Sequence, residues 1–251
     1  MSQPHVVHVV PHTHWDREWY LPFPAFRIRL DRLIAALLDE MERAAGLRFT
    51  LDGQLACVED YLELRPEDEP RLRALVEDGR LSIGPWYTLV DEFLVSGESI
   101  VRNLELGIER GHRLGGVMPV GYLPDSFGHI AQMPQILSRA GIEDAVVWRG
   151  VPAIIERHSF RWESPDGSAV RAEYLPLGYG NAAHLLDPPA RIGPRMQRLR
   201  AALEPFFAPD EPLAMLGTDH MIPHPRLAEI IAQANREPGE CATNSRRWRS
   251  T

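Results

Sequence analysis

Two imidazoles and one carboxylate occupy every second position of a short run near the start of the sequence. His12, His14 and Asp16 follow directly after an apolar, β-branched run at residues 6–10, which is typical of a buried parallel strand that Pro11 would end. If the backbone beyond it stays extended, alternate side chains project to one side, and two of them could bind one cation. A turn residue or a hydrogen-bonded structural histidine is the commoner role of such residues, so the run alone leaves both interpretations open.

Further ionisable residues come directly after other predicted strands. Because the carboxyl ends of parallel strands meet at one rim, these side chains are expected to gather there. Several acids on one rim repel each other unless a cation or a shared proton relieves them, so a metal site is the simplest explanation, although Asp52 and Asp91 could equally cap helices. The predicted strands are residues 6–10, 47–51, 81–83, 120–123, 145–148 and 213–216, and they are followed by Asp16, Asp52, Asp91 with Glu92, Asp125, Arg149 and Asp219.

The elements between these strands read as helices. Apolar residues recur at helical spacing in stretches that end near glycines, as at Gly46 and Gly79. Strands alternating with helices predict a single α/β domain with a parallel sheet, either open or closed into a barrel. The turn at residues 165–167 predicts an inserted β-hairpin formed by 160–162 and 170–174. The predicted helices are residues 26–41, 58–64, 72–77, 98–112, 135–140, 192–206 and 227–235.

Composition excludes several classes of protein. The chain has 251 residues, 44% of them hydrophobic, enough for a sizeable core. Its net charge of −8 argues against a nucleic-acid partner, because phosphate binding needs a basic surface. Cys57 and Cys241 are too few for a disulfide framework. Neither a signal peptide nor a membrane span is recognisable, so a cytoplasmic protein is expected.

Three segments resemble a known enzyme family. Residues 11–16, Pro-His-Thr-His-Trp-Asp, with Trp19, and residues 121–129, Gly-Tyr-Leu-Pro-Asp-Ser-Phe-Gly-His, are similar to the signature segments of glycoside hydrolase family 38, the α-mannosidases. Residues 84–92 resemble a third segment, and the resemblance extends from about residue 5 to about residue 235. It implies a catalytic domain over residues 1–236 that is a parallel seven-stranded α/β barrel, one strand more than the six predicted.

The resemblance also implies a set of catalytic and metal-binding residues. One Zn²⁺ ion would be held by His14, Asp16 and Asp125, with Asp125 also the nucleophile and Asp219 the general acid/base. The residue types suit retaining hydrolysis of an α-mannoside, in which one carboxylate attacks the anomeric carbon and another carboxyl protonates the leaving oxygen. A zinc ion beside the sugar would bind its hydroxyls and keep the nucleophile ionised.

Other residues of these segments are candidates for contact with the substrate. Trp19 offers an aromatic face for the sugar, while Asp91 and Glu92 could bind its hydroxyls. Arg149 could bond the nucleophile carboxylate or the substrate, with a structural salt bridge an equal alternative. His12 and His129 could orient the carboxylates, although a plain structural role fits them as well.

Two departures from the family pattern bear on activity. The family's fourth zinc ligand is a histidine further downstream than this chain extends, and neither His220 nor His224 stands in the matching context. Residues 237–251 carry no apolar periodicity and are expected to form an irregular tail, as after a truncation. The alternatives are therefore a metal-dependent deacetylase or amidohydrolase on a similar barrel, or a non-catalytic sugar-binding remnant. Oligomeric state, linkage and aglycone stay open.

Overall fold

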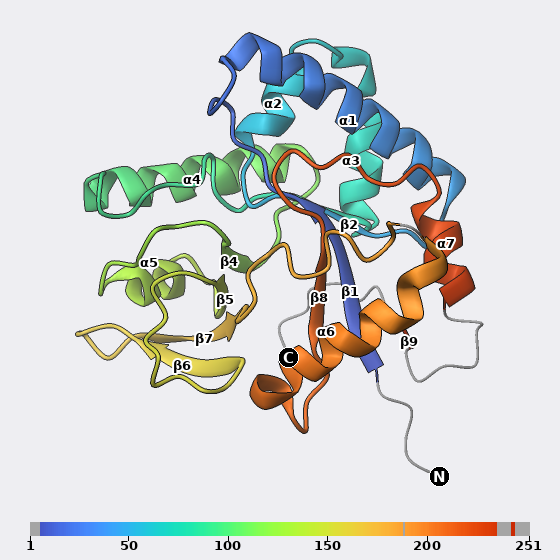
Figure 1. The fold of residues 1–251 in the computed structure, drawn as a ribbon. Helices are drawn as coiled ribbons and strands as arrows, with labels where there is room; N and C mark the ends of the chain where they lie inside the picture. The colour runs from blue at the N-terminus through green and yellow to red at the C-terminus, as the bar shows by residue number, and fades with distance from the viewer. Residues whose placement is uncertain (1–5, 188, 235–241, 244–251) are drawn as a thin grey trace.

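A computed structural model describes residues 6–187, 189–234 and 242–243, whose strands form two sheets (Figure 1). The first sheet has the order β3-β2-β1-β8, with β9 also paired to β1, and all of its pairs are parallel. The second has the order β4-β5-β7-β6, antiparallel only between β6 and β7. The strands are β1 (Val6–Thr13), β2 (Phe49–Leu51), β3 (Leu81–Ser82), β4 (Val120–Leu123), β5 (Asp144–Val147), β6 (Ser159–Glu163), β7 (Ala169–Tyr174), β8 (Leu213–Leu216) and β9 (Ala242–Thr243).

Helices cover the outer faces of both sheets. In Figure 1, α1, α2 and α3 lie over the β2 end of the first sheet, α6 runs beside β8 and β1, and α4 and α5 flank the second sheet. Among the described residues, no helix is both long and apolar enough to cross a membrane. The helices are α1 (Phe23–Arg43), α2 (Ala56–Leu62), α3 (Glu69–Glu77), α4 (Gly97–Arg113), α5 (Met133–Arg139), α6 (Ile192–Phe207) and α7 (Leu227–Ala234), with short 3-10 turns at Pro66–Asp68 and Pro189–Arg191.

The longest helix shows why these elements form. In α1, Phe26, Leu30, Leu33 and Leu37 recur at intervals of three and four residues and are all fully buried. This spacing places them on one stripe of the helix, which packs on the first sheet. Burying a side chain of this size stabilises the fold by roughly 1.5–3 kcal/mol before the cost of ordering it.

An apolar layer joins the two sheets. Tyr122, Val146 and Met215 come from β4, β5 and β8 and form one buried cluster, against which Val10 of β1 packs. Backbone hydrogen bonds that involve loop residues also link the two halves: Met118 N–H donates to the Ile83 carbonyl at 2.8 Å, and Ala182 N–H donates to the Met215 carbonyl at 3.1 Å. The inner faces of the two sheets therefore enclose a shared core.

The single seven-stranded barrel implied by the resemblance is not confirmed. The described strands form two separate sheets. β3 has only two residues, and the hydrogen bonds that link it to the second sheet involve loop residues. The predicted inserted hairpin does form as β6 and β7, but β7 also pairs in parallel with β5 through Ala172 and Ala145, so it is an integral strand of the sheet.

One other prediction about the backbone was wrong, and another lies mostly outside the described residues. Pro11 was expected to end the first strand, but β1 continues through Thr13, because His12 and Thr13 pair onward with β2 and only one N–H is missing at the proline. The irregular tail predicted at 237–251 lies outside the described residues except for Ala242–Thr243, which pair with β1 as β9.

Candidate active site and metal centre

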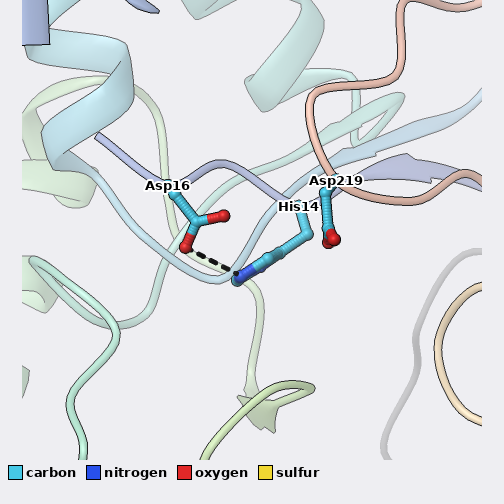
Figure 2. Close-up of side chains that lie close together, drawn as sticks. All are labelled: His14, Asp16 and Asp219. Carbon is cyan, nitrogen blue, oxygen red and sulfur yellow. Dashed lines mark ion pairs between the residues drawn. The ribbon is translucent and has the colours of Figure 1, made fainter. Parts of the chain in front are cut away.

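His14, Asp16 and Asp219 meet just beyond the carboxyl ends of β1 and β8. Beyond the strand ends, the backbones of His14 and Asp219 form an isolated parallel β-bridge. One potential ligand atom from each of the three residues lies within 4.8 Å of the others. In Figure 2 the His14 ring extends toward the Asp16 carboxylate, with its Nε2 atom 3.7 Å from Oδ1 of Asp16, and the Asp219 carboxylate lies beside the His14 side chain.

Asp125 and Arg149 reach the same place from the second sheet. Leu123 and Val147 are paired in register, so the loops that follow β4 and β5 begin at the same level. The Nε and Nη2 atoms of Arg149 both donate to Oδ1 of Asp125, at 2.9 and 2.7 Å. The other oxygen, Oδ2, lies 4.0 Å from Nε2 of His14. The Asp125 carboxylate therefore lies between Arg149 and His14, with one oxygen facing each.

Aromatic rings hold the Arg149 guanidinium in place. Its central carbon lies 4.0 Å from the ring centroid of Trp148 and 4.6 Å from that of Phe127. His129 also contributes, since its Nε2 lies 3.1 Å from the Arg149 carbonyl while its Nδ1 lies 2.7 Å from the carboxylate of Glu92. The structural and carboxylate-binding roles left open for Arg149 are thus combined in one ion pair, and His129 supports the arginine backbone.

A completely buried carboxylate, Asp52, lies behind His14. Its Oδ2 atom is 3.2 Å from Nδ1 of His14. Burial alone would lower the pKa of His14, but the charge of Asp52 overrides it and raises that pKa to about 9 in the metal-free protein. The sequence placed Asp52 at this rim, but with helix capping as an equal alternative, since the contact across strands is visible only in the fold.

Tyr179 and His220 were not predicted as site residues. The Tyr179 hydroxyl donates to Oδ1 of Asp219 at 2.6 Å. The pKa of the phenol is raised, mainly by burial and also by this hydrogen bond. The Asp16 N–H donates to Nε2 of His220 at 3.1 Å. Tyr179 follows β7, and a position after a parallel strand is the sequence signal for a residue at this site. Because β7 was predicted to belong to an inserted hairpin, that signal did not apply to Tyr179.

Of the predicted substrate-binding residues Asp91, Glu92 and Trp19, only Asp91 lines a pocket at the site. A pocket of about 400 Å³ is lined by Asp91 together with His14, Asp16 and Asp125. Glu92 lies outside it, because its carboxylate is buried and accepts the Ile130 N–H at 2.8 Å.

Trp19 does not line this pocket, and His12 is not part of the cluster of His14, Asp16 and Asp219. Trp19 is 63% exposed and packs beside Tyr20 and His220. His12 is buried with its Nε2 atom 2.7 Å from the Tyr179 carbonyl, and burial lowers its pKa to about 4. His12 is therefore neutral at pH 7 and structural in its contacts.

Comparison with known proteins decides the family. Residues 4–244 match the model of the glycosyl hydrolases family 38 N-terminal domain. The chain belongs to this family. It is 40% identical over 228 residues to a protein of Halalkalibacterium halodurans named "Putative mannosylglycerate hydrolase", an alignment covering 85% of this chain and 25% of that protein. It is 29% identical to the human protein named Alpha-mannosidase 2C1, over 68% of this chain and 17% of that one.

Solved structures agree with the family 38 assignment. A crystal structure titled as an alpha-mannosidase from Enterococcus faecalis superposes with a TM-score of 0.90 at 33% identity, covering 95% of this chain and 28% of that one. A polysaccharide deacetylase of Mycobacterium smegmatis has a TM-score of 0.58 at 13% identity, which shows a likeness of fold alone. The chain spans about a quarter of the length of the H. halodurans and E. faecalis proteins.

The donor set of this family 38 chain fits a divalent cation. One imidazole and several carboxylates are suitable ligands for zinc or a similar ion. Burial raises the pKa of Asp16, and the charges of Asp219 and Asp125 raise it further, a repulsion that a cation would relieve. The predicted ligand set named Asp125 as its second acid. The three described residues whose ligand atoms all lie within 4.8 Å of one another include Asp219 instead, while Asp125 lies 4.0 Å from His14.

Proposed function

We propose that this chain carries the glycone site of a retaining, metal-dependent α-mannosidase. The observation that supports this most is the convergence of Asp125 and Asp219 on His14 and Asp16, from loops that follow three different strands. A retaining glycosidase needs two carboxyl groups that flank the scissile bond, and Asp125 and Asp219 would supply them from two sides of the site. Family 38 membership and the names of the relatives support the same substrate class.

In the proposed reaction Asp125 is the nucleophile. The two donors from Arg149 occupy its Oδ1 atom and orient the carboxylate, which leaves Oδ2 for attack on the anomeric carbon. The bond that forms joins Oδ2 to the sugar, and the bond that breaks is the one to the leaving oxygen.

Asp219 is the proposed general acid and then the general base. As an acid it gives its proton to the leaving oxygen. As a base it removes a proton from the water that releases the sugar from Asp125. The Tyr179 hydroxyl, 2.6 Å from Oδ1 of Asp219, fixes the rotamer of this carboxyl group.

His14, Asp16 and Asp125 would hold one Zn²⁺ ion, with Asp219 beside them as the proton donor. When bound, the ion supplies Lewis-acid contacts for sugar hydroxyls. Asp91 lines the pocket and remains the proposed hydroxyl-binding residue, and Trp19 the proposed aromatic contact. A cytoplasmic location, the 1–236 catalytic domain and the lack of a nucleic-acid partner stay predictions.

Turnover of an aryl α-mannoside by the purified chain tests this function. We expect activity that chelation abolishes and Zn²⁺ restores, and that Asp125→Ala lowers by at least about 10³-fold, because a nucleophile has no substitute. A chain with an unchanged rate after Asp125→Ala would contradict the mechanism.

Two further outcomes would favour the alternatives. Release of acetate from an acetylated sugar would favour the deacetylase. Binding of mannose without turnover, even in added zinc, would favour the sugar-binding remnant.

A further inference from the structure

We propose that Asp52 is a positioning residue that fixes the tautomer and orientation of His14, so that Nε2 carries the lone pair available to the metal. This inference rests on the metal site proposed above. It adds a residue from the turn after β2 to a metal site and acid/base pair that the sequence assigned to the segments after β1, β4 and β8.

The Asp52 carboxylate is itself rigidly held. It is fully buried and sits at a backbone φ of 54° in the turn after β2. Its Oδ2 atom accepts the Trp15 N–H at 2.9 Å and the Gln54 side-chain amide at 2.8 Å, while Oδ1 accepts the Gly53 N–H at 2.8 Å. Three donors from two segments thus fix which way the carboxylate faces.

The turn that carries Asp52 is wedged between β1 and β4. The Gln54 side chain also donates to the Trp15 carbonyl at 2.6 Å, so both polar groups of the Trp15 backbone are bound to this turn. A Cβ atom added at Gly53 would lie 3.0 Å from the ring of Tyr122 and 3.1 Å from its carbonyl, which leaves little space for the turn to shift. The carboxylate is consequently a fixed reference point beneath His14.

His14 presents Nδ1 to this reference point. Nδ1 is buried and, among the described residues, has no aligned hydrogen bond, although Oδ2 of Asp52 lies at ion-pair distance, 3.2 Å. A neutral imidazole carries one proton, and a buried N–H without an acceptor costs roughly 1–3 kcal/mol. The proton is therefore favoured on Nδ1, facing Asp52.

The opposite ring nitrogen then faces the acids of the site. Nε2 lies 3.7 Å from Asp16 and 4.0 Å from Asp125, without its own proton in this tautomer. Metal-binding histidines that donate their other N–H to a carboxylate bind metal about 10–100-fold more tightly than those that lose this partner.

The first test is calorimetric titration of the 251-residue chain with Zn²⁺. Asp52→Asn keeps the size of the side chain but removes its charge, and we expect it to weaken Zn²⁺ binding by about 10–100-fold. Glu173→Gln is the matched control, since Glu173 is also a buried carboxylate 2.8 Å from a histidine, His158, but belongs to β7 away from the cluster. The control should bind Zn²⁺ like the parent, and circular dichroism would check that each variant is folded.

A second measurement needs no substitution. Long-range ¹H–¹⁵N correlation spectra of the labelled, zinc-loaded chain report which nitrogen of His14 is protonated, and we expect a proton on Nδ1. A protonated Nε2, or equal affinity in Asp52→Asn and the parent, would overturn the role of Asp52 alone. A parent chain that binds no Zn²⁺ would instead overturn the proposed metal site and this inference with it.

Discussion

At the scale of single residues, the partner of a side chain decides its chemistry. His12 near the end of β1 and His14 just beyond it are two residues apart, and both are buried. His12 has a backbone carbonyl as its partner and a pKa lowered to about 4 by burial, whereas His14 has a carboxylate and a pKa raised to about 9. Residue type and spacing alone do not separate a structural imidazole from a ligand.

Asp219 can be tested as the acid with two substrates. A dinitrophenyl α-mannoside has a leaving group that needs no protonation, while a methyl α-mannoside has one that does. We expect Asp219→Asn to lower kcat/KM by about 10²–10⁴-fold for the methyl mannoside and to change it little for the dinitrophenyl mannoside. Equal losses with both substrates would contradict the acid role.

At the scale of elements, close approach of β1 and β8 brings His14 to Asp219. The His14 N–H donates to the Thr218 carbonyl at 3.3 Å, and the His220 N–H donates to the His14 carbonyl at 2.8 Å. Gly217 allows this approach, because a Cβ there would lie only 1.8 Å from the His12 carbonyl oxygen. A backbone contact of this kind cannot be relieved by a side-chain rotation.

Gly217→Ala should therefore damage both the fold and the site. We expect the free energy of unfolding to fall by about 1–3 kcal/mol or more, with weaker Zn²⁺ binding, measured by denaturant titration and calorimetry. Gly193→Ala is the control, because a Cβ in that position of α6 has nothing within 4 Å. It should not lower stability, because alanine restricts the unfolded chain more than glycine does, and a similar loss with the two substitutions would contradict the steric argument.

At the scale of the whole molecule, His158 ties the second sheet to α6 and to the segment before β8. Its Nδ1 atom lies 2.8 Å from Glu173 and its Nε2 atom 3.0 Å from Asp210, while its ring stacks on Phe207 at 4.2 Å. The bond to Glu173 is the main cause that raises the pKa of His158, opposed by burial. The protonated imidazole thus stabilises the fold.

This pair predicts a pH dependence of stability. Because the pKa of His158 is raised above 6.5 in the folded state, its stabilisation is complete below pH 6.5 and is lost as the pH rises through the raised value. Glu173→Gln should lower Tm at pH 6 by about 2–4 °C, as for a loss of about 1 kcal/mol, and by less at pH 9. Thermal unfolding of both proteins across this range checks it, and a constant difference in Tm would contradict the assignment.

Local sequence pattern was enough to predict most helices and strands and to place the acids at the carboxyl ends of the strands. Helical spacing located α1, apolar runs located β4 and β8 with the bounds observed, and the acids after the strands placed Asp16, Asp125 and Asp219 at one end of the molecule. Only the tertiary structure decided that β7 pairs with β5 and that the strands form two sheets. It also decided that Asp52 faces His14 and Tyr179 binds Asp219. These contacts join residues far apart in the chain, and such pairings leave no periodic signal because they depend on how the strands pack.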